Sequence, residues 1–427
     1  MLTKCNVSYC PFLSTSNPFD KSKAFLGTYR RRKETSHIDC RRMIKGDTNY
    51  AKEIGAHRPG LVAQNLSMCC EDIRRRVMGP APMREVEFGV AHARIVSKHY
   101  DFIEEELRSS YHPQNYFCYA IEKEADDVFR AKIKRVASCL PNVVIIPEEF
   151  DTHFLEYNGE YIDNAFYSCM KLLAKRPGWE YMILLLNNDV VIKSPYEFVE
   201  IYKILDGVND VEVSPCPEKR WNLSMKWDAR SLKLFVDESL ATPQQLNAKL
   251  QFAKGSAQAS FSRAAVEWLV GTVNLTTLLD QINSMRAAAH EEPFPSLQAS
   301  DELDMPGRFT SECLKQGKKT HAITRFSQWE YTNILNCRTH NRYNGACVFG
   351  IEDLQKISET PHLIAYVTLP DFDYGLADCV HELIFNRTFL AQVDHPLNLS
   401  YYRNAVHVKY HNSRKHSNAN YKLECEE

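Results

Sequence analysis

Three features that would direct a chain of 427 residues to a membrane or to nucleic acid are lacking in this sequence. No stretch approaches the roughly 18 consecutive apolar residues that a membrane helix requires. The N-terminal stretch MLTKCNVSYCPFLSTSNPFDKSK lacks the apolar core of a secretory signal. A net charge of -2 gives no reason to expect nucleic acid or an anionic membrane surface as the main partner. Taken alone, these absences indicate a cytosolic protein.

Cysteines and sequons point to a different compartment. The chain has 14 cysteines, which is many for a cytosolic protein, and none of them shows the paired CxxC spacing of a zinc site. Asn-x-Ser/Thr sequons are also frequent, and they are glycosylated only in the secretory lumen. We therefore expect a lumenal protein whose N-terminal anchor is not visible in this sequence. Besides a sequon at Asn6, the expected glycosylation sites are Asn65, Asn222, Asn274, Asn386 and Asn398.

The stretch YMILLLNNDVVIK, residues 181–193, is the centre of the predicted fold. Its apolar run from Met182 to Leu186 is bounded by polar residues, which is typical of a strand buried on both faces of a sheet. In open α/β sheets the ligand crevice lies beyond the carboxyl ends of such strands. Asp189 would then lie at the edge of a site. The alternative is that Asn-Asn-Asp is only a turn after a core strand.

The chain divides into three segments by composition. Residues 1–84 are basic and polar and read as a largely irregular stem or linker, with one short helix at 70–78. Residues 85–405 carry the periodic patterns of a folded domain, and residues 406–427 form a polar tail that we expect to be disordered. The patterns predict strands at 85–97, 116–121, 143–146 and 181–192 and helices at 101–109, 126–137, 159–175 and 195–205.

Strands that alternate with helices at this spacing indicate an α/β fold with a doubly wound, mainly parallel sheet flanked by helices. From residue 211 onward the pattern becomes irregular. There we predict helices at 243–252, 263–270 and 277–288 and short strands at 321–324, 346–349 and 363–367.

The order of several short motifs resembles a known family. The stretches HPQNYFCYAIEKE, VASCLPNVVI, SCMKLL and LLNNDVVIKSPYEFV are followed by NDVEV, an Arg-Trp pair, HEEPFPSLQ, MPGRFTSEC, a Trp-Glu-Tyr triplet and CVFGIEDL. This ordered set, over about residues 85–385, resembles the Core-2/I-branching β-1,6-N-acetylglucosaminyltransferases, and their nematode-like members most. No single motif is decisive, but the set is fairly specific.

The resemblance implies a GT-A-type nucleotide-sugar fold with an irregular acceptor-binding half. It also implies an inverting glycosyltransferase that moves a sugar, usually N-acetylglucosamine, from a UDP donor to a glycan hydroxyl and forms a β-1,6 branch on protein-linked glycans. Members of the family are type II membrane proteins of the Golgi. They need no cofactor or divalent metal, because basic side chains hold the diphosphate.

Inverting transfer needs one general base for the acceptor hydroxyl and a means of stabilising the leaving diphosphate. The family base is the Glu of an Asp-Glu-x-x-Trp stretch, which matches His290-Glu291-Glu292-Pro293-Phe294 and places the base at Glu291. Because Asp has become His and Trp has become Phe, Glu292 remains an alternative. A solvated acidic loop with no catalytic role is the other reading.

The resemblance also assigns acceptor- and donor-binding residues. In the family a Glu, an Arg beside a Trp, and an aromatic pair recognise the acceptor, and these match Glu212, Arg220, Trp329 and Tyr331. Carboxylate and guanidinium groups suit sugar hydroxyls and an aromatic face suits the ring, although core packing would explain the two aromatics equally well. The expected donor-binding residues are Glu122, Asp189 and Arg342.

One departure from the family concerns the diphosphate. The second basic residue of the family lies in a Phe-Ala-Asn-Lys-Phe-like stretch, and the match here, residues 363–367 (LIAYV), has no lysine. A metal-free site that lacks one of two cations would lose part of its leaving-group stabilisation. The rival to an active transferase is therefore an inactive relative that binds a glycan or a protein. A xylosyltransferase-like enzyme is a third possibility.

The family also has matching cysteines. Its pairing implies the disulfides Cys118–Cys169, Cys70–Cys139 and Cys337–Cys347, with Cys379 tied back to the N-terminal stem at Cys40. Connectivity cannot be deduced from sequence alone, and buried free thiols are the alternative.

Overall fold

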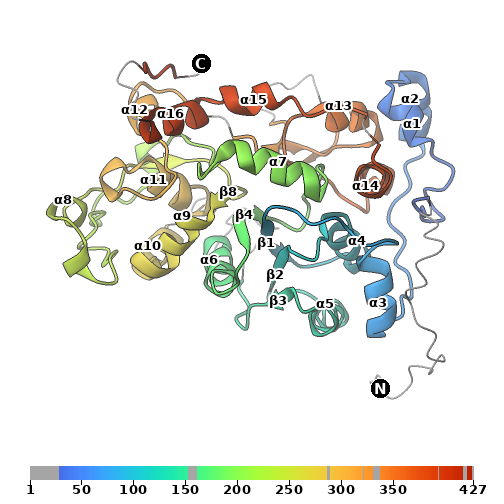
Figure 1. Cartoon of the computed structure of the whole chain (residues 1–427), viewed down its shortest axis with the longest axis horizontal. Helices are drawn as coiled ribbons and strands as arrows, with labels where there is room; N and C mark the ends of the chain where they lie inside the picture. Colours follow the sequence, from blue (N-terminus) through green and yellow to red (C-terminus); the bar gives the residue numbers. More distant parts are fainter. Residues whose placement is uncertain are drawn as a thin grey trace.

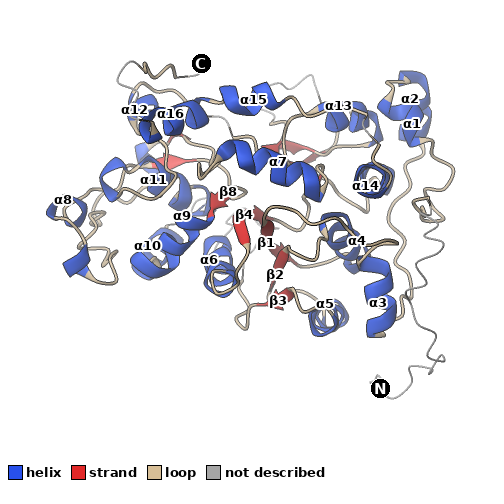
Figure 2. Ribbon diagram, in the orientation of Figure 1, coloured by secondary structure: helices blue, strands red, loops and turns tan. Residues whose placement is uncertain are grey.

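The computed structural model describes residues 28–151, 161–285, 289–320, 322–329, 337–392, 394–416 and 421–425. A five-stranded sheet of order β3-β2-β1-β4-β8 lies at its centre, with helices on both faces (Figures 1 and 2). Its strands are β1 (Gly89–Val96), β2 (Tyr116–Ile121), β3 (Val143–Ile145), β4 (Trp179–Leu185) and β8 (Ser260–Ser262). The first four run parallel and β8 is antiparallel to β4, which confirms the predicted α/β fold with a mainly parallel sheet.

Successive side chains of the central strands enter two different cores, because side chains alternate across a sheet. On one face Ala91 and Cys118 pack in a core with helix α6 (Ile162–Leu173). On the other face Val90 packs with helix α7 (Pro195–Leu205). The sheet is therefore wound on both faces. The remaining helices of this half are α4 (Tyr100–Ser110) and α5 (Asp127–Cys139).

The predicted central strand 181–192 is wrong in one respect, because it is broken in two. β4 ends at Leu185, and β5 (Val190–Val191) belongs to a separate three-stranded sheet of order β5-β12-β9. The break is made by Asp189, whose carboxylate accepts a hydrogen bond from the Leu186 N–H at 2.6 Å. A side-chain acceptor that captures a backbone donor closes a turn and ends the strand.

The second half is irregular, as expected, but several predicted elements there are shifted or shortened. The helix predicted at 243–252 is only α8 (Pro243–Leu246), and α9 (Arg263–Glu267) continues into the π-helical turn η3 (Trp268–Thr272). The strand predicted at 321–324 lies instead at β9 (Arg325–Phe326), and residue 321 is outside the described residues. The other short strands are β6 (Ser214–Pro215), β7 (Ala253–Lys254), β10 (Arg342–Tyr343), β11 (Ala346–Cys347) and β12 (Ile364–Ala365). The other helices are α10 (Thr276–Asn283), α11 (Pro293–Ala299), α12 (Glu312–Lys315), α13 (Leu354–Glu359), α14 (Tyr374–Phe389) and α15 (Leu399–Asn404).

Residues 28–84 are packed against the domain along one side of it (Figure 1). They form α1 (Cys40–Ile44), α2 (Thr48–Ala56) and α3 (Cys70–Val77). Arg58 forms ion pairs with Glu352 and with Asp373, the latter at 2.9 Å between Nη1 and Oδ2. From residue 28 on, the segment predicted to be a largely irregular stem is therefore part of the folded body.

The expectation that residues beyond 405 are disordered is also wrong for most of them. Val406–Lys415 form helix α16, in which Val406, His407 and Val408 are buried. The imidazole Nε2 of His407 lies 3.1 Å from the Oδ1 of Asp210. A disulfide between Cys313 and Cys425 fixes the segment that follows α16. Among the helices that the structure describes, none has the length and apolarity needed to cross a bilayer.

All four disulfides that the resemblance implies are present. They are Cys40–Cys379, Cys70–Cys139, Cys118–Cys169 and Cys337–Cys347, with Cα–Cα distances of 5.0 to 5.7 Å. A further disulfide between described residues, Cys313–Cys425, was not predicted. Cys216 is a free thiol.

The sequons differ sharply in exposure. Asn65, Asn222, Asn274 and Asn398 are exposed, whereas Asn386 lies in helix α14 with 7% of its surface exposed. A glycan at Asn386 would have no room in this fold, which argues against that expected site. Asn6 lies outside the described residues.

Candidate active site

Two antiparallel strands bring the candidate acceptor-binding and catalytic segments together. Pairing of β6 with β7 places the segment after Glu212 beside residues 253–255. The N–H of Gly255 then donates to the backbone oxygen of Glu291 at 2.8 Å. A Cβ on residue 255 would lie 1.9 Å from the backbone oxygen of Glu212, so only glycine allows this close approach. Glu212 and Glu291 are thereby held on neighbouring segments.

The guanidinium of Arg220 contacts both candidate bases. Its Nη1 donates to Glu291 Oε2 at 2.8 Å, and its Nε lies 2.7 Å from Glu292 Oε1 in an ion pair. Arg220 ends the short 3-10 helix η1 (Glu218–Arg220), and Trp221 after it stacks on Phe252 with ring centroids 3.9 Å apart. An aromatic cluster thus anchors the arginine on which the two carboxylates converge.

The two glutamates have very different environments. The Glu292 side chain is 1% exposed, and its Oε2 accepts no hydrogen bond from the described residues. Burial raises the pKa of Glu292 to about 8, against the opposing effect of the Arg220 charge. The Glu291 side chain is 29% exposed. At neutral pH Glu292 is therefore mainly protonated, and Glu291 is the carboxylate that a solvent-borne substrate can reach.

A third carboxyl group lies close to this pair and was not predicted. Asp163 is buried near the start of α6, and its Oδ1 makes no hydrogen bond among the described residues. Burial, and secondly the charge of Glu292, raise the pKa of Asp163 well above its ordinary value. Two buried acids that share one region disfavour each other's ionisation.

A second cluster is centred on Arg325, another residue that was not predicted. Its Nη1 donates to Gln258 Oε1 at 3.1 Å, and its Nη2 donates to Glu212 Oε2 at 3.0 Å. Gln258 Nε2 in turn donates to Asp189 Oδ1 at 3.0 Å. These contacts form a continuous network from Asp189 to Glu212. It links one predicted donor-binding residue to one predicted acceptor-binding residue.

Trp329 belongs to the same cluster. The Arg325 guanidinium carbon lies 5.3 Å from the centroid of the Trp329 ring and 5.7 Å from that of Tyr366. Trp329 is half-buried, so part of its ring remains accessible. Tyr331 lies outside the described residues. An extended segment places residues 325, 327 and 329 on one face, and this alternation is the signal that could have identified Arg325 from sequence.

The predicted donor residues lie in three different settings. Glu122 follows β2 and is buried. Burial, and secondly the charge of Glu122, raise the pKa of Tyr343 to about 12. Strand β10 therefore lies near Glu122. Arg342, beside Tyr343, is exposed. Asp189 is fully buried, and both of its carboxylate oxygens accept hydrogen bonds from Leu186 and Gln258. Direct contact of Asp189 with a donor is therefore not supported, and the turn interpretation of this residue is the better one.

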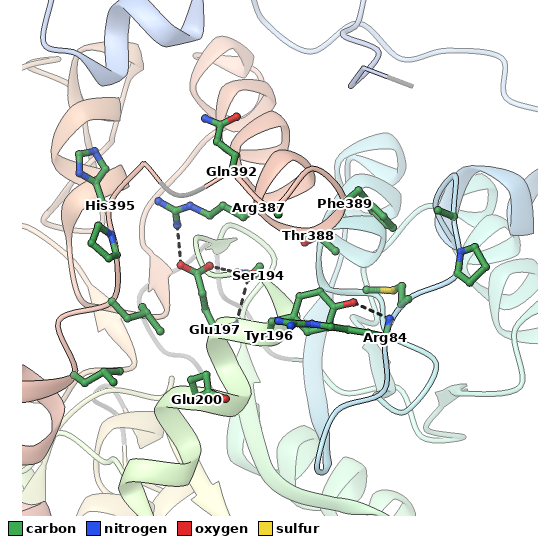
Figure 3. Close-up of a pocket in the computed structure, with 17 residues that line it drawn as sticks. Arg84, Ser194, Tyr196, Glu197, Glu200, Arg387, Thr388, Phe389, Gln392 and His395 are labelled. Atoms are coloured by element: carbon green, nitrogen blue, oxygen red, sulfur yellow. Dashed lines mark hydrogen bonds and ion pairs between the residues drawn. The ribbon is translucent and has the colours of Figure 1, made fainter. Parts of the chain in front are cut away.

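A cavity of about 750 Å³ lies elsewhere, between the start of α7, the end of α14 and residues 81–84 (Figure 3). Three of its charged side chains are engaged with each other or with a neighbouring ring. Glu197 caps α7 and pairs with Arg387 at 3.3 Å, and the Arg84 guanidinium lies 4.2 Å from the Tyr196 ring centroid. None of the predicted site residues lines this cavity. We therefore place the candidate site at the Arg220 and Arg325 clusters.

Within the described ranges, no group of three or more His, Cys, Asp or Glu side chains is arranged to hold a metal ion.

Comparisons with known proteins agree on one family. Residues 90–358 match the family model described as Core-2/I-Branching enzyme. Three similar relatives are named as beta-1,3-galactosyl-O-glycosyl-glycoprotein beta-1,6-N-acetylglucosaminyltransferases. The Homo sapiens protein is 24% identical over 373 residues (82% of this chain, 85% of the relative), and type 3 from Rattus norvegicus is 24% identical over 371 residues (82% and 83%). The protein of Bovine herpesvirus 4 strain LVR140 is 24% identical over 372 residues (81% and 82%).

Similarity to solved structures is more distant. The mannosyltransferase Ktr4p from S. cerevisiae is 12% identical and covers 62% of this chain and 77% of its own, with a TM-score of 0.24. That score is too low for a comparison of the two sites.

Proposed function

The chain belongs to the Core-2/I-branching enzyme family, and on this premise we propose that it transfers N-acetylglucosamine from a UDP donor to a hydroxyl of a protein-linked glycan. The proposed product is a β-1,6 branch. The relatives are named as enzymes of this specificity and are similar over four-fifths of the chain. The observation that carries the proposal in this chain is the pairing of Glu291 with Arg220 beside the buried Glu292.

Glu291 is the proposed general base. In an inverting displacement the acceptor oxygen attacks the anomeric carbon, its proton passes to Glu291, and the bond from that carbon to the diphosphate breaks with its electron pair leaving on UDP. The base must be ionised and within reach of the acceptor hydroxyl. Glu291 meets the requirement of access, whereas Glu292 is buried and holds a proton at neutral pH.

Arg220, Glu212 and Trp329 are the proposed acceptor-binding residues. Arg220 also orients Glu291 through its 2.8 Å hydrogen bond. Glu212 is 31% exposed, so its carboxylate can accept hydrogen bonds from sugar hydroxyls. The accessible part of the Trp329 ring offers an apolar plane to the C–H face of a sugar.

We propose that the reaction needs no divalent metal and takes place in the Golgi lumen. The five described disulfides support an oxidising compartment, since disulfides persist there and are rare in the cytosol. Charge on the leaving diphosphate must then be met by basic side chains.

A donor panel tests the proposal. The purified chain is incubated with an O-glycopeptide acceptor and, separately, with UDP-N-acetylglucosamine, UDP-xylose, UDP-galactose and UDP-glucose, and products are identified by mass spectrometry. We expect one added N-acetylhexosamine with the first donor only. Addition of a pentose from UDP-xylose would assign the xylosyltransferase activity instead.

A second candidate function is a glycan-binding relative without activity. The observation that favours it is Tyr366, which occupies the stretch where the family has a lysine. Binding of the glycopeptide with neither transfer nor hydrolysis of any UDP-sugar would establish this alternative.

A further inference from the structure

Arg325 lies at the centre of the second of the two clusters that form the candidate site. It begins β9, where it pairs with Ile364 of β12, and β12 pairs in turn with β5 just after Asp189. The Arg325 side chain is 10% exposed and approaches Gln258, Glu212, Trp329 and Tyr366. This position is a product of the fold, because Gln258, Glu212 and Tyr366 come from three segments of the chain that are distant from Arg325 in sequence.

The backbone before Arg325 is held by a buried carboxylate. Asp210 accepts hydrogen bonds from the N–H of Ile323 at 3.0 Å and of Thr324 at 2.6 Å. His407 of α16 contacts the same carboxylate at 3.1 Å. Two backbone hydrogen bonds to Asp210 fix the backbone immediately before residue 325, while the Arg325 guanidinium is held only by side chains.

The guanidinium of Arg325 is paired less firmly than that of the buried Arg94. Arg94, which also contacts the Asp189 turn, is 4% exposed and is paired with Glu106, itself 1% exposed. Glu212, the ion-pair partner of Arg325, is 31% exposed and contacts it through one oxygen. The Nε of Arg325 makes no hydrogen bond among the described residues. An ion pair with one exposed partner is weak and is readily exchanged for a better anion.

A diphosphate is a better anion for this guanidinium than a single carboxylate. It offers several oxygens, and a planar guanidinium binds phosphate oxygens through two parallel N–H bonds. The diphosphate also gains negative charge as the bond to the sugar breaks, so a cation fixed beside it stabilises the transition state more than the ground state. Tyr366, whose ring centroid lies 5.7 Å from the guanidinium carbon, offers the cation an aromatic face.

We propose that Arg325 binds the diphosphate of the nucleotide-sugar and gives up Glu212 in exchange, so that donor binding releases Glu212 for the acceptor. The inference rests on the proposed function and deepens it in two ways. It assigns a phosphate-binding cation to a chain whose matched stretch, residues 363–367, has no lysine. It also couples the two substrates, because one carboxylate cannot hold Arg325 and an acceptor hydroxyl equally well at once.

The coupling predicts that substitutions of Arg325 and of Glu212 change the Kd for UDP in opposite directions. Arg325→Gln removes a charge-assisted contact to phosphate and should raise the Kd for UDP by about 10- to 100-fold. Glu212→Gln removes the competitor for the guanidinium and should lower the Kd for UDP by about two- to fivefold, the range of an exposed ion pair. In the double variant the Glu212 substitution should have no effect on UDP, because the guanidinium for which it competes is gone.

The measurement is titration calorimetry with UDP in the presence of EDTA, on the full chain, with each variant checked by thermal unfolding. Arg230→Gln and Glu238→Gln are matched controls, since this pair lies 3.2 Å apart with both side chains about half exposed and away from the site. Both controls should leave the Kd for UDP unchanged. Should Arg325→Gln fail to fold, Glu212→Gln alone carries the test, since damage to the fold would weaken binding and not tighten it.

The outcomes separate this inference from the proposed function. If the wild-type chain does not bind UDP at all, the proposed function fails and the inference fails with it. If the wild type binds UDP and both single variants bind it equally well, the inference alone is overturned. Weaker UDP binding by Glu212→Gln would also overturn it, because Glu212 would then position Arg325 for the diphosphate and not compete with it.

Discussion

Arg220 and Glu291, 71 positions apart in the chain, are joined by a hydrogen bond of 2.8 Å from Nη1 to Oε2. The first was expected to bind the acceptor and the second to act as the base, and the structure brings them together. The same guanidinium lies against Glu292, which is fully buried. One arginine thus holds an accessible carboxylate and also contacts a second carboxyl group that is buried.

Glu291→Gln should lower kcat for transfer by about 10²- to 10⁴-fold, the usual contribution of a general base, while the Kd for UDP stays within twofold or so of wild type. Glu292→Gln is the matched control and should keep most of the activity, since a protonated carboxyl and an amide are similar in shape and charge. Initial rates with saturating donor and acceptor give the comparison. Normal turnover by Glu291→Gln together with loss of turnover in Glu292→Gln would show that Glu292, and not Glu291, is the base.

Glu292 should also make stability depend on pH. Its folded-state pKa of about 8 lies above the ordinary value of 4.5, so between these pH values the folded state holds a proton that the unfolded state has lost. The free energy of unfolding therefore decreases as pH rises through this window. Glu292→Gln removes the contribution, and its melting temperature should exceed that of the wild type increasingly from pH 5 to about pH 8.

Thermal unfolding followed by circular dichroism at several pH values measures this difference. Glu291→Gln serves as the control for a change of charge next to the same arginine. Melting curves of wild type and Glu292→Gln that shift in parallel with pH would show that Glu292 is ionised in the folded protein.

The Cys313–Cys425 disulfide should hold the C-terminal segment in place. It closes a loop of 112 residues that includes α13 to α16, and such a cross-link typically contributes about 2 to 4 kcal/mol to the free energy of unfolding. The variant Cys313→Ser/Cys425→Ser should unfold at lower denaturant concentration and lose residues after α16 to limited proteolysis. Cys216→Ser, which alters a free thiol, should do neither. Equal protease resistance in both variants would mean that packing of α16 suffices.

Glycan occupancy should follow exposure. When the chain is produced in a secretory host, mass spectrometry of its glycopeptides should find glycans at the exposed Asn65, Asn222, Asn274 and Asn398 and none at the buried Asn386. Enzymatic release of the glycans in heavy-oxygen water marks each occupied site. A glycan found at Asn386 would mean that α14 packs differently from the structure described.

Local signals explain which parts of the fold could be predicted. The helix 195–205 and the strand 116–121 were placed to the residue. Ser194 and Glu197 form a capping box with Pro195 at the start of α7, and β2 is apolar on both faces. Helix α14 was missed because it is buried on nearly all sides and so shows no amphipathic period. The break after Leu185 depends on one side-chain hydrogen bond, that of Asp189 to Leu186, which leaves no trace in the hydrophobic pattern.

For the candidate site, residues near recognisable motifs could be named, but their connections could not. Glu291, Arg220 and Glu212 follow from the family resemblance, whereas their contacts arise from the β6–β7 pairing and the glycine at 255. Arg325 and Gln258 act through partners more than 60 positions away, at distances that only the folded chain defines. Asp189 illustrates the reverse case, since its position after a core strand suggested a ligand contact that its complete burial does not allow.

The central claim is metal-free transfer of N-acetylglucosamine with Glu291 as the base. We would measure transfer from UDP-N-acetylglucosamine to a β-1,3-galactosyl O-glycopeptide by the wild type and by Glu291→Gln, each with EDTA and with Mn²⁺. The account predicts a β-1,6-linked product from the wild type at equal rates under both conditions and almost none from the variant. Transfer by the wild type that requires Mn²⁺, or equal transfer by the variant, would contradict it.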